Sequence, residues 1–134
     1  MITRHNVGKA DKKLKVLLAE DNQINQKLAV RILEKNGHKV KVAADGNQTI
    51  SAWEKGTFDL ILMDVQMPKM DGLEATRIIR SKEKAKKSHT SIIAMTAHAM
   101  KGDRERCLEA GMDDYIAKPL NPNDLIEIIN KNIR

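Results

Sequence analysis

The sequence predicts a doubly wound α/β domain built on a five-stranded parallel sheet. Five short apolar runs alternate with five stretches of helical periodicity along the 134 residues. The apolar runs are nearly continuous rather than alternating with polar residues, which indicates strands that are covered on both faces. Parallel strands joined by helices take right-handed crossovers, so helices are expected on both sides of the sheet.

The predicted strands are short and rich in branched apolar residues. The third of them is the most apolar stretch of the chain and opens directly onto Asp64. In chain order the five predicted strands are Lys15–Ala19, His38–Ala43, Phe58–Met63, Ser91–Met95 and Asp113–Ala117.

The predicted helices begin and end at recognisable signals. Residues 71–74 have the spacing of a capping box and start a helix that runs to about Ser81, after which Lys82–Thr90 is interpreted as a loop. Asn121 followed by Pro122 opens the last helix. The other three helices are a first one with Ile24, Leu28 and Ile32 on one face and a stop at Gly37, a second from about Gly46 to Glu54, and a fourth that ends at Gly111.

Positive charge is concentrated in two stretches of the chain. The formal net charge is +6, and residues 1–15 carry a net +4 while Lys82–Lys87 carry a net +3. Charged runs of this kind are usually solvated tails and loops. Charge alone would favour a nucleic-acid-binding module, but no recognition motif is visible and three aromatic residues offer no stacking platform. We therefore predict a basic tail or linker over 1–13, a folded domain over 14–134, and no direct nucleic-acid binding.

The single cysteine, Cys107, excludes an intrachain disulfide and suits a reducing compartment. It falls within a helical pattern, where an inert thiol is the simpler interpretation. No apolar run approaches the roughly 18 residues that span a bilayer, and the polar N-terminus lacks the apolar region of a signal peptide. These features predict a soluble, cytoplasmic domain with no membrane span in this chain.

Polar side chains follow four of the five predicted strands at the point where each strand ends. The first strand leads into Glu20 and Asp21, the third into Asp64, the fourth into Thr96 and the fifth into Lys118. The working site of a doubly wound sheet lies at the carboxyl ends of its strands. We therefore expect three carboxylates, a hydroxyl and an ammonium to meet at one edge of the sheet.

Three neighbouring carboxylates repel one another, and leaving them unpaired would raise the pKa of at least one. A site made of oxygen ligands favours Mg²⁺. Neutralisation by Lys118 alone is the structural alternative, but one ammonium offsets only one of three charges. No phosphate-binding G-x-x-x-x-G-K-[ST] loop is present, so nucleotide hydrolysis is not expected. An Asp carboxylate can itself attack phosphorus, with Lys118 and Thr96 holding the phosphoryl oxygens.

The polar positions lie within longer motifs, and in this combination the chain resembles the receiver domains of two-component response regulators. The resemblance covers roughly residues 14–132. It implies a flavodoxin-like (βα)5 fold with strand order 2-1-3-4-5. It also implies a signalling phosphoprotein rather than a conventional enzyme, a domain that catalyses its own phosphorylation and dephosphorylation. The motifs are Glu20-Asp21, Asp64-Val-Gln-Met-Pro68, Asp71-Gly72, Met95-Thr-Ala97 and Lys118-Pro119.

The resemblance assigns the acidic residues to a Mg²⁺ site. Asp64 is implied to be the phosphorylation site and, with Asp21, a direct ligand of the ion. Glu20 is implied to act largely through a metal-bound water, and Gln66 to supply a backbone carbonyl. Positions two residues beyond the phosphorylated Asp and beyond the site hydroxyl tune the phosphoryl lifetime in this family, which makes Gln66 and His98 modulators.

The resemblance also implies a conformational switch. Thr96 and Lys118 are expected to contact the phosphoryl oxygens, and Pro119 follows a bond that is usually cis. Tyr115 occupies the aromatic switch position, three residues before the lysine. In the family, the Thr and aromatic side chains move together on phosphorylation and reshape the face made by the fourth helix, fifth strand and fifth helix. That face is also the expected surface of a homodimer.

Three segments are similar, more narrowly, to the receivers of hybrid sensor histidine kinases: residues 19–25, 63–68 and 94–98. The implied partner is a histidine kinase or a histidine phosphotransfer domain, and the implied reaction is phosphorelay from a phosphohistidine. A stand-alone, single-domain response regulator is the alternative. A Mg²⁺-dependent aspartyl-phosphate phosphatase of the haloacid dehalogenase type is less favoured, because that family has D-x-D where Asp64-Val-Gln66 lacks the second carboxylate.

Overall fold

The computed structural model describes residues 13–97 and 101–133 of the chain. Within these residues it has five strands and five helices, which are β1 (Lys15–Ala19), α2 (Gln23–Lys35), β2 (Lys39–Ala43), α3 (Gly46–Lys55), β3 (Leu60–Asp64), α4 (Gly72–Lys86), β4 (Ser91–Thr96), α5 (Lys101–Ala110), β5 (Asp114–Ala117) and α6 (Pro122–Asn132). The strands form one parallel sheet in the order β2-β1-β3-β4-β5. The predicted fold class and strand order are confirmed.

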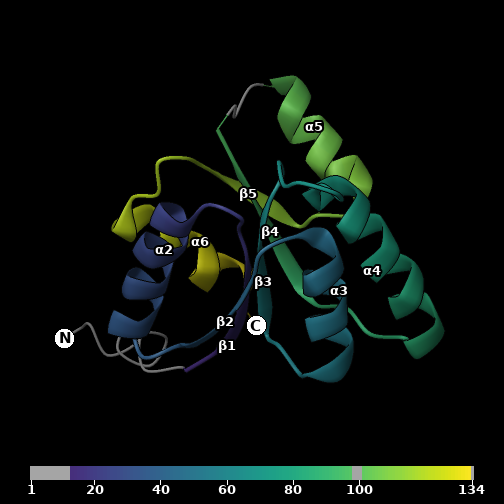
Figure 1. Cartoon of the computed structure of the whole chain (residues 1–134), viewed down its shortest axis with the longest axis horizontal. Helices are drawn as coiled ribbons and strands as arrows, with labels where there is room; N and C mark the ends of the chain where they lie inside the picture. Colours follow the sequence, from purple (N-terminus) through teal and green to yellow (C-terminus); the bar gives the residue numbers. More distant parts are fainter. Residues whose placement is uncertain (1–12, 98–100, 134) are drawn as a thin grey trace.

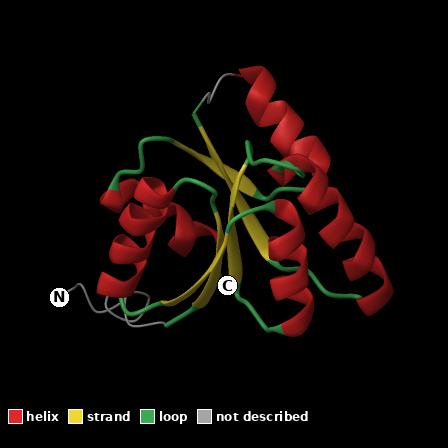
Figure 2. Cartoon of the chain, viewed as in Figure 1, coloured by secondary structure: helices red, strands yellow, loops and turns green. Residues whose placement is uncertain are grey.

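Two layers of helices cover the sheet. Figure 1 shows α2 and α6 on one face and α3, α4 and α5 on the other, and Figure 2 shows the same arrangement as helix, strand, helix. Alternate side chains of each central strand enter one of two apolar cores. Trp53, Ile79 and Cys107 pack with Ile61 and Met63 in the core under α3, α4 and α5. The core under α2 and α6 contains Leu18, Ala29, Leu33, Leu62, Ile93, Leu125 and Ile129.

The strand register brings the carboxyl ends of the strands to one edge. Ala19 at the end of β1 pairs with Met63, one residue before the end of β3. Asp64 pairs with Met95 of β4, and Thr96 pairs with Ala117 at the end of β5. Residues that follow these strands therefore lie side by side, although they come from separate parts of the sequence.

The polar run that was predicted to be a loop is mostly helix. Helix α4 continues to Lys86, five residues beyond the predicted end at Ser81. The sequence Lys-Glu-Lys-Ala-Lys consists of good helix formers, and Glu83 is buried against Arg80 one turn earlier. The helix ends where Lys87 adopts a left-handed conformation with φ of 54°. The prediction of its start is confirmed, because the Asp71 side chain accepts from the Glu74 amide at 2.9 Å.

The apolar face predicted for the first helix is only partly buried. Ile32 lies in the core, but Ile24 is 78% exposed and Leu28 is 38% exposed. The stripe of α2 that faces the sheet consists of Ala29, Ile32 and Leu33. Packing within this domain therefore does not account for the apolar character of positions 24 and 28.

Residue 14, just before β1, packs into the folded domain. Residues 1–12 of the predicted tail lie outside the described residues, so the boundary at 13–14 stays a prediction. Leu14 is buried, and its amide donates to His38 Nδ1 at 3.1 Å.

None of the described helices is long and apolar enough to cross a membrane. Cys107 is buried, and burial raises the pKa of its thiol, which keeps the thiol protonated and unreactive.

Candidate functional site

The five polar residues predicted to converge do lie together. They line one cavity of about 220 Å³ at the carboxyl edge of the sheet. Glu20 and Asp21 follow β1, Asp64 and Thr96 end β3 and β4, and Lys118 follows β5. The complete lining is Glu20, Asp21, Asn22, Asn25, Asp64, Val65, Gln66, Thr96, Ala97 and Lys118.

The three carboxylates are close enough to share one ion. One oxygen from each of Glu20, Asp21 and Asp64 lies within 4.8 Å of the others. Glu20 and Asp64 are buried, whereas Asp21 is exposed at the mouth of the cavity. An octahedral Mg²⁺ with bonds of about 2.1 Å separates its ligands by roughly 3–4 Å, so small side-chain adjustments suffice.

An incompletely satisfied oxygen supports the same conclusion. Glu20 Oε1 is buried and accepts no aligned hydrogen bond, although Lys118 Nζ lies 2.9 Å away. A buried carboxylate oxygen with spare acceptor capacity is costly unless a cation or an ordered water satisfies it. An all-oxygen donor set with this spare capacity fits Mg²⁺ bound directly or through water.

Lys118 bridges two of the carboxylates. Its Nζ is 2.9 Å from Glu20 Oε1 and 3.2 Å from Asp64 Oδ2. Burial alone would lower the pKa of this ammonium, but close contact with Glu20 and attraction to Asp64 outweigh burial, and the pKa is raised. The bond between Lys118 and Pro119 is cis, as the resemblance implied. One ammonium facing three carboxylates leaves the cavity with excess negative charge, so neutralisation by Lys118 is incomplete.

Asp64 holds its proton more tightly than an ordinary Asp. Its pKa is raised from 3.8 to about 6, first because the carboxyl is buried and then because Glu20 repels its charged form. Lys118 and the amide of Gln66, which donates to Asp64 Oδ1 at 3.1 Å, oppose this rise. A bound divalent cation would stabilise the charged carboxylate and lower this pKa.

The loop after β1 fixes the backbone beside Glu20. The Asn22 amide donates to Glu20 Oε2 at 3.1 Å, and the Asn22 side chain caps α2 by accepting from the Asn25 amide at 3.0 Å. Gln26 Nε2 donates to the Glu20 carbonyl at 2.6 Å. The sequence motifs indicate no role for Asn22, Asn25 or Gln26. The N-cap preference of Asn before a helix was the signal that could have singled out Asn22.

The loop after Asp64 depends on a glycine. The Gly72 amide donates to the Val65 carbonyl at 2.9 Å. A Cβ at Gly72 would lie 2.2 Å from the Asp64 carbonyl oxygen, far inside contact distance. The first turn of α4 can therefore approach the end of β3 only because residue 72 has no side chain.

The predicted switch and modulator residues lie in different surroundings. Gln66 lines the cavity and is exposed, and its backbone amide contacts Asp64. His98 lies outside the described residues, so its predicted role stays a prediction. Tyr115 is half-buried on β5, and its hydroxyl accepts from Arg104 of α5 at 2.8 Å. The Arg104 guanidinium also lies 5.5 Å from the centre of the Tyr115 ring.

Most of the chain matches a known protein family. The family described as the response regulator receiver domain matches residues 16–130. The chain is 50% identical over 124 residues to hybrid signal transduction histidine kinase I of Dictyostelium discoideum, covering 89% of this chain and 7% of that protein. It is 41% identical to the sensor protein GacS of Pseudomonas syringae, covering 87% of this chain and 13% of that protein. The chain thus spans a small part of these relatives.

Solved structures share both the fold and part of the sequence. A receiver domain of a sensor histidine kinase from Pseudomonas aeruginosa, with magnesium coordinated in its active-site cleft, has a TM-score of 0.81 and 42% identity, covering 90% of this chain and 98% of that one. The receiver domain of Ssk1 from Saccharomyces cerevisiae, in complex with the histidine phosphotransfer protein Ypd1, has a TM-score of 0.83 and 34% identity, covering 90% and 88%.

Proposed function

This chain belongs to the response regulator receiver domain family, and from that premise we propose that Asp64 is its phosphoacceptor in a Mg²⁺-dependent reaction. The observation that carries the proposal is the meeting of Asp64 with Glu20, Asp21 and Lys118 in one cavity. Among the described residues, Asp64 is the one carboxylate that ends a strand, contacts Lys118 and lies close to Glu20 and Asp21.

The reaction is a phosphoryl transfer to a carboxylate oxygen. An Asp64 oxygen attacks the phosphorus of a phosphohistidine, an O–P bond forms, and the N–P bond breaks with its electron pair returning to the imidazole. Lys118 Nζ, already 3.2 Å from Asp64 Oδ2, and the Thr96 hydroxyl at the end of β4 hold the phosphoryl oxygens. Such transfer depends mainly on positioning and charge stabilisation, which a buried, preorganised site supplies.

Asp21 and Asp64 would hold a Mg²⁺ ion directly, Glu20 would hold it through water, and the backbone carbonyl of Gln66 would add a further oxygen. The chemistry such an ion would supply is a weaker repulsion between the Asp64 carboxylate and the incoming phosphoryl group. The magnesium in the cleft of the Pseudomonas aeruginosa receiver domain supports this assignment.

Mass spectrometry of the intact protein tests the proposal. In acetyl phosphate and Mg²⁺ we expect the protein to gain one phosphoryl group, and the Asp64→Asn variant or added EDTA to prevent the gain. The gain should need no kinase, because the domain catalyses its own phosphorylation. Continuous release of phosphate from unrelated organic phosphates would instead favour the phosphatase alternative, and labelling of Asp64→Asn would refute Asp64 as the acceptor.

Phosphorylation of Asp64 acts on the face made by α5, β5 and α6. The phosphoryl group adds about −1.5 to −2 charge next to Thr96. Thr96 and Tyr115 then move together, and the exposed contact between Tyr115 and Arg104 is the first to change. This face, where Leu108 is 48% exposed, is also the surface we propose for a homodimer.

The phosphohistidine donor is a histidine kinase or a histidine phosphotransfer domain, with this chain as the receiver of a hybrid kinase. The matches to hybrid kinases and the complex of the yeast receiver with Ypd1 support this choice. Asn25 lines the cavity at the start of α2, so a donor that reaches Asp64 passes close to this end of the helix. Ile24 and Leu28 there, with Val42 on β2, are exposed apolar side chains that such a partner would bury.

Replacing Ile24 with Gln should slow transfer from a phosphorylated histidine phosphotransfer domain by about tenfold or more, as loss of a central apolar contact usually does. Phosphorylation by acetyl phosphate should be unchanged, because Ile24 is 78% exposed and does not line the cavity. Lys55→Gln is the control, because Lys55 is exposed at the end of α3 and belongs to neither proposed surface. Equal rates for wild type and Ile24→Gln with the protein donor would exclude this surface of α2.

A further inference from the structure

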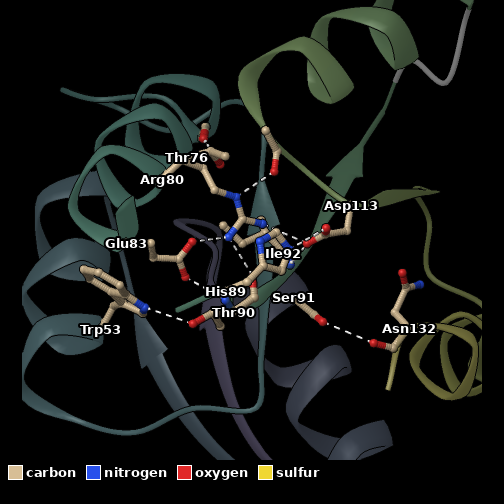
Figure 3. Close-up of polar contacts among 12 residues, drawn as sticks. Trp53, Thr76, Arg80, Glu83, His89, Thr90, Ser91, Ile92, Asp113 and Asn132 are labelled. Atoms are coloured by element: carbon tan, nitrogen blue, oxygen red, sulfur yellow. Dashed lines mark hydrogen bonds and ion pairs between the residues drawn. The ribbon is translucent and has the colours of Figure 1, made fainter. Parts of the chain in front are cut away.

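A network of charged side chains, of which Glu83 is buried and Arg80 and Asp113 are half-buried, lies at the amino ends of the strands, opposite Asp64. Arg80 of α4 donates to Glu83 Oε1 at 2.5 Å and to Asp113 Oδ2 at 2.8 Å. The side chains of Glu83 and Arg80 are only 3% and 15% exposed. Figure 3 shows these groups together, with the Arg80 guanidinium between the two carboxylates. We call Arg80, Glu83 and Asp113 the Arg80 clamp.

The Arg80 clamp joins the starts of two strands to α4. Arg80 also donates to the Thr90 carbonyl at 2.8 Å, while Glu83 accepts from the Thr90 amide at 2.6 Å. Asp113 accepts from the Ile92 amide at 2.8 Å. Thr90 precedes β4 and Asp113 precedes β5. These charge-assisted bonds to backbone groups hold the amino ends of both strands against α4.

The same arginine holds the end of α5. Arg80 Nε donates to the Gly111 carbonyl at 2.8 Å, immediately after the last residue of the helix. Gly111 has a φ of 109°, and a Cβ there would lie 2.8 Å from Arg80 Cγ. A side chain at position 111 would therefore collide with Arg80, so this close approach requires glycine.

The two ends of α5 differ in how firmly they are held. Among the described side chains of α5, the buried ones are Cys107 and Ala110, both in its second half. Those of residues 102–106 are exposed or half-buried, and Arg104 contacts Tyr115 at the surface. The first half of α5 therefore contacts the switch residue Tyr115 through an exposed hydrogen bond. The C-terminal end of the helix is held by buried side chains instead.

We propose that the Arg80 clamp is the fixed end of α5, so that phosphorylation displaces the first half of the helix about a stationary C-terminal end. This rests on the proposed phosphorylation of Asp64. Opening the clamp would leave the buried Glu83 carboxylate without its cation, so the clamp resists opening. An exposed hydrogen bond such as that of Arg104 is exchanged for water at little cost. Arg80 is a positioning residue, because it acts through α5 and touches no reacting atom.

Amide hydrogen exchange with and without acetyl phosphate and Mg²⁺ tests this proposal. In the wild type, phosphorylation should change exchange at residues 105–107 by about fivefold or more and at 111–113 by less than about twofold, within the range of coupling between sites. In Arg80→Lys, which keeps the charge but not the fork of donors, the phosphorylation-dependent change should spread to residues 111–113. Arg77→Lys, an exposed position on the same helix, should behave as wild type.

The outcomes separate this proposal from the phosphorylation itself. Equal changes at 105–107 and 111–113 in the phosphorylated wild type would overturn it without any variant, even if Arg80→Lys fails to fold. If intact mass shows no phosphoryl group, the proposed function fails. In that case, the exchange rates of the unphosphorylated wild type and Arg80→Lys still test whether the clamp holds the C-terminal end of α5. Exchange at 111–113 should be about tenfold faster in Arg80→Lys than in wild type, and rates within about twofold would refute the clamp.

Discussion

Replacing Asp64 with Asn should raise the free energy of unfolding by about 1–3 kcal/mol at pH 7 in metal-free buffer. The Asp64 carboxylate is buried, is repelled by Glu20, and has a pKa raised from 3.8 to about 6. Each pKa unit corresponds to about 1.4 kcal/mol, so this shift sets an upper limit of about 3 kcal/mol. Asn has the same shape and no charge. It forfeits only the attraction of Lys118, which lies 3.2 Å from Asp64 Oδ2.

The advantage of Asp64→Asn should depend on pH. Since the pKa of Asp64 in the folded protein lies above its ordinary value, the native state binds more protons than the unfolded chain between about pH 4 and pH 6. The stability of the wild type contributed by this group is therefore present below about pH 4 and is lost as the pH rises to about 6. The difference between the two proteins should grow over this interval and stay constant above it.

Urea denaturation in EDTA at several pH values measures this difference. Glu127→Gln removes an exposed carboxylate from α6 and should change the free energy of unfolding by less than about 0.5 kcal/mol. Mg²⁺ should stabilise the wild type and the Glu127→Gln control but much less the Asp64→Asn variant. An Asp64→Asn protein that is less stable than the wild type at every pH would show that the buried Asp64 carboxylate does not destabilise the folded state.

Replacing Lys118 with Met should have the opposite effect, lowering the free energy of unfolding by about 2–4 kcal/mol in metal-free buffer. The ammonium lies within 3.2 Å of both Glu20 and Asp64, and the described residues offer these two buried carboxylates no other ion pair. In the variant the pKa of Asp64 should rise further, because the positive charge of Lys118 lowers this pKa in the wild type. Added Mg²⁺ should recover much of the loss, since the ion supplies the missing positive charge.

The Lys118→Met protein should still accept a phosphoryl group in Mg²⁺ but should fail to switch. Intact mass measures the first property, and the shift of the Tyr115 ring resonances on phosphorylation measures the second. Lys131→Met is the matched control, because Lys131 is 75% exposed and lies 3.7 Å from Asp114, where an ion pair contributes less than about 1 kcal/mol. Unaltered switching in Lys118→Met would remove this residue from the mechanism.

The site could be predicted from the sequence because its position in a parallel sheet does not depend on the exact residue at which each strand ends. The predicted strand ends differ from the observed ones by only one or two residues, as at Asp64 and Thr96. In a parallel sheet such ends meet at one edge wherever the connecting helices begin and end. Locating Glu20, Asp21 and Lys118 after apolar runs was therefore enough to place them together.

Other features had no local signal. The partners of Arg80 lie 3, 10, 31 and 33 residues away in the sequence, so no short pattern indicates the clamp. The charge of Lys82–Thr90 favours a loop, although Lys82–Lys86 consists of residues that favour helix and Glu83 is buried by Arg80. The periodicity of Ile24 and Leu28 predicted an apolar face correctly, but periodicity cannot tell a face that packs inside the domain from one left for a partner.

The most direct test of the whole account is the position of the bound metal ion. In nuclear magnetic resonance spectra of the ¹⁵N-labelled protein, a trace of Mn²⁺ should broaden the amide signals of residues 20–22 and 64–66 first, and excess Mg²⁺ should reverse the broadening. Asp21→Asn should weaken this binding about tenfold or more while leaving the fold intact, because Asp21 is exposed. Broadening centred on another part of the chain, or broadening that Mg²⁺ does not reverse, would contradict a shared site for Glu20, Asp21 and Asp64.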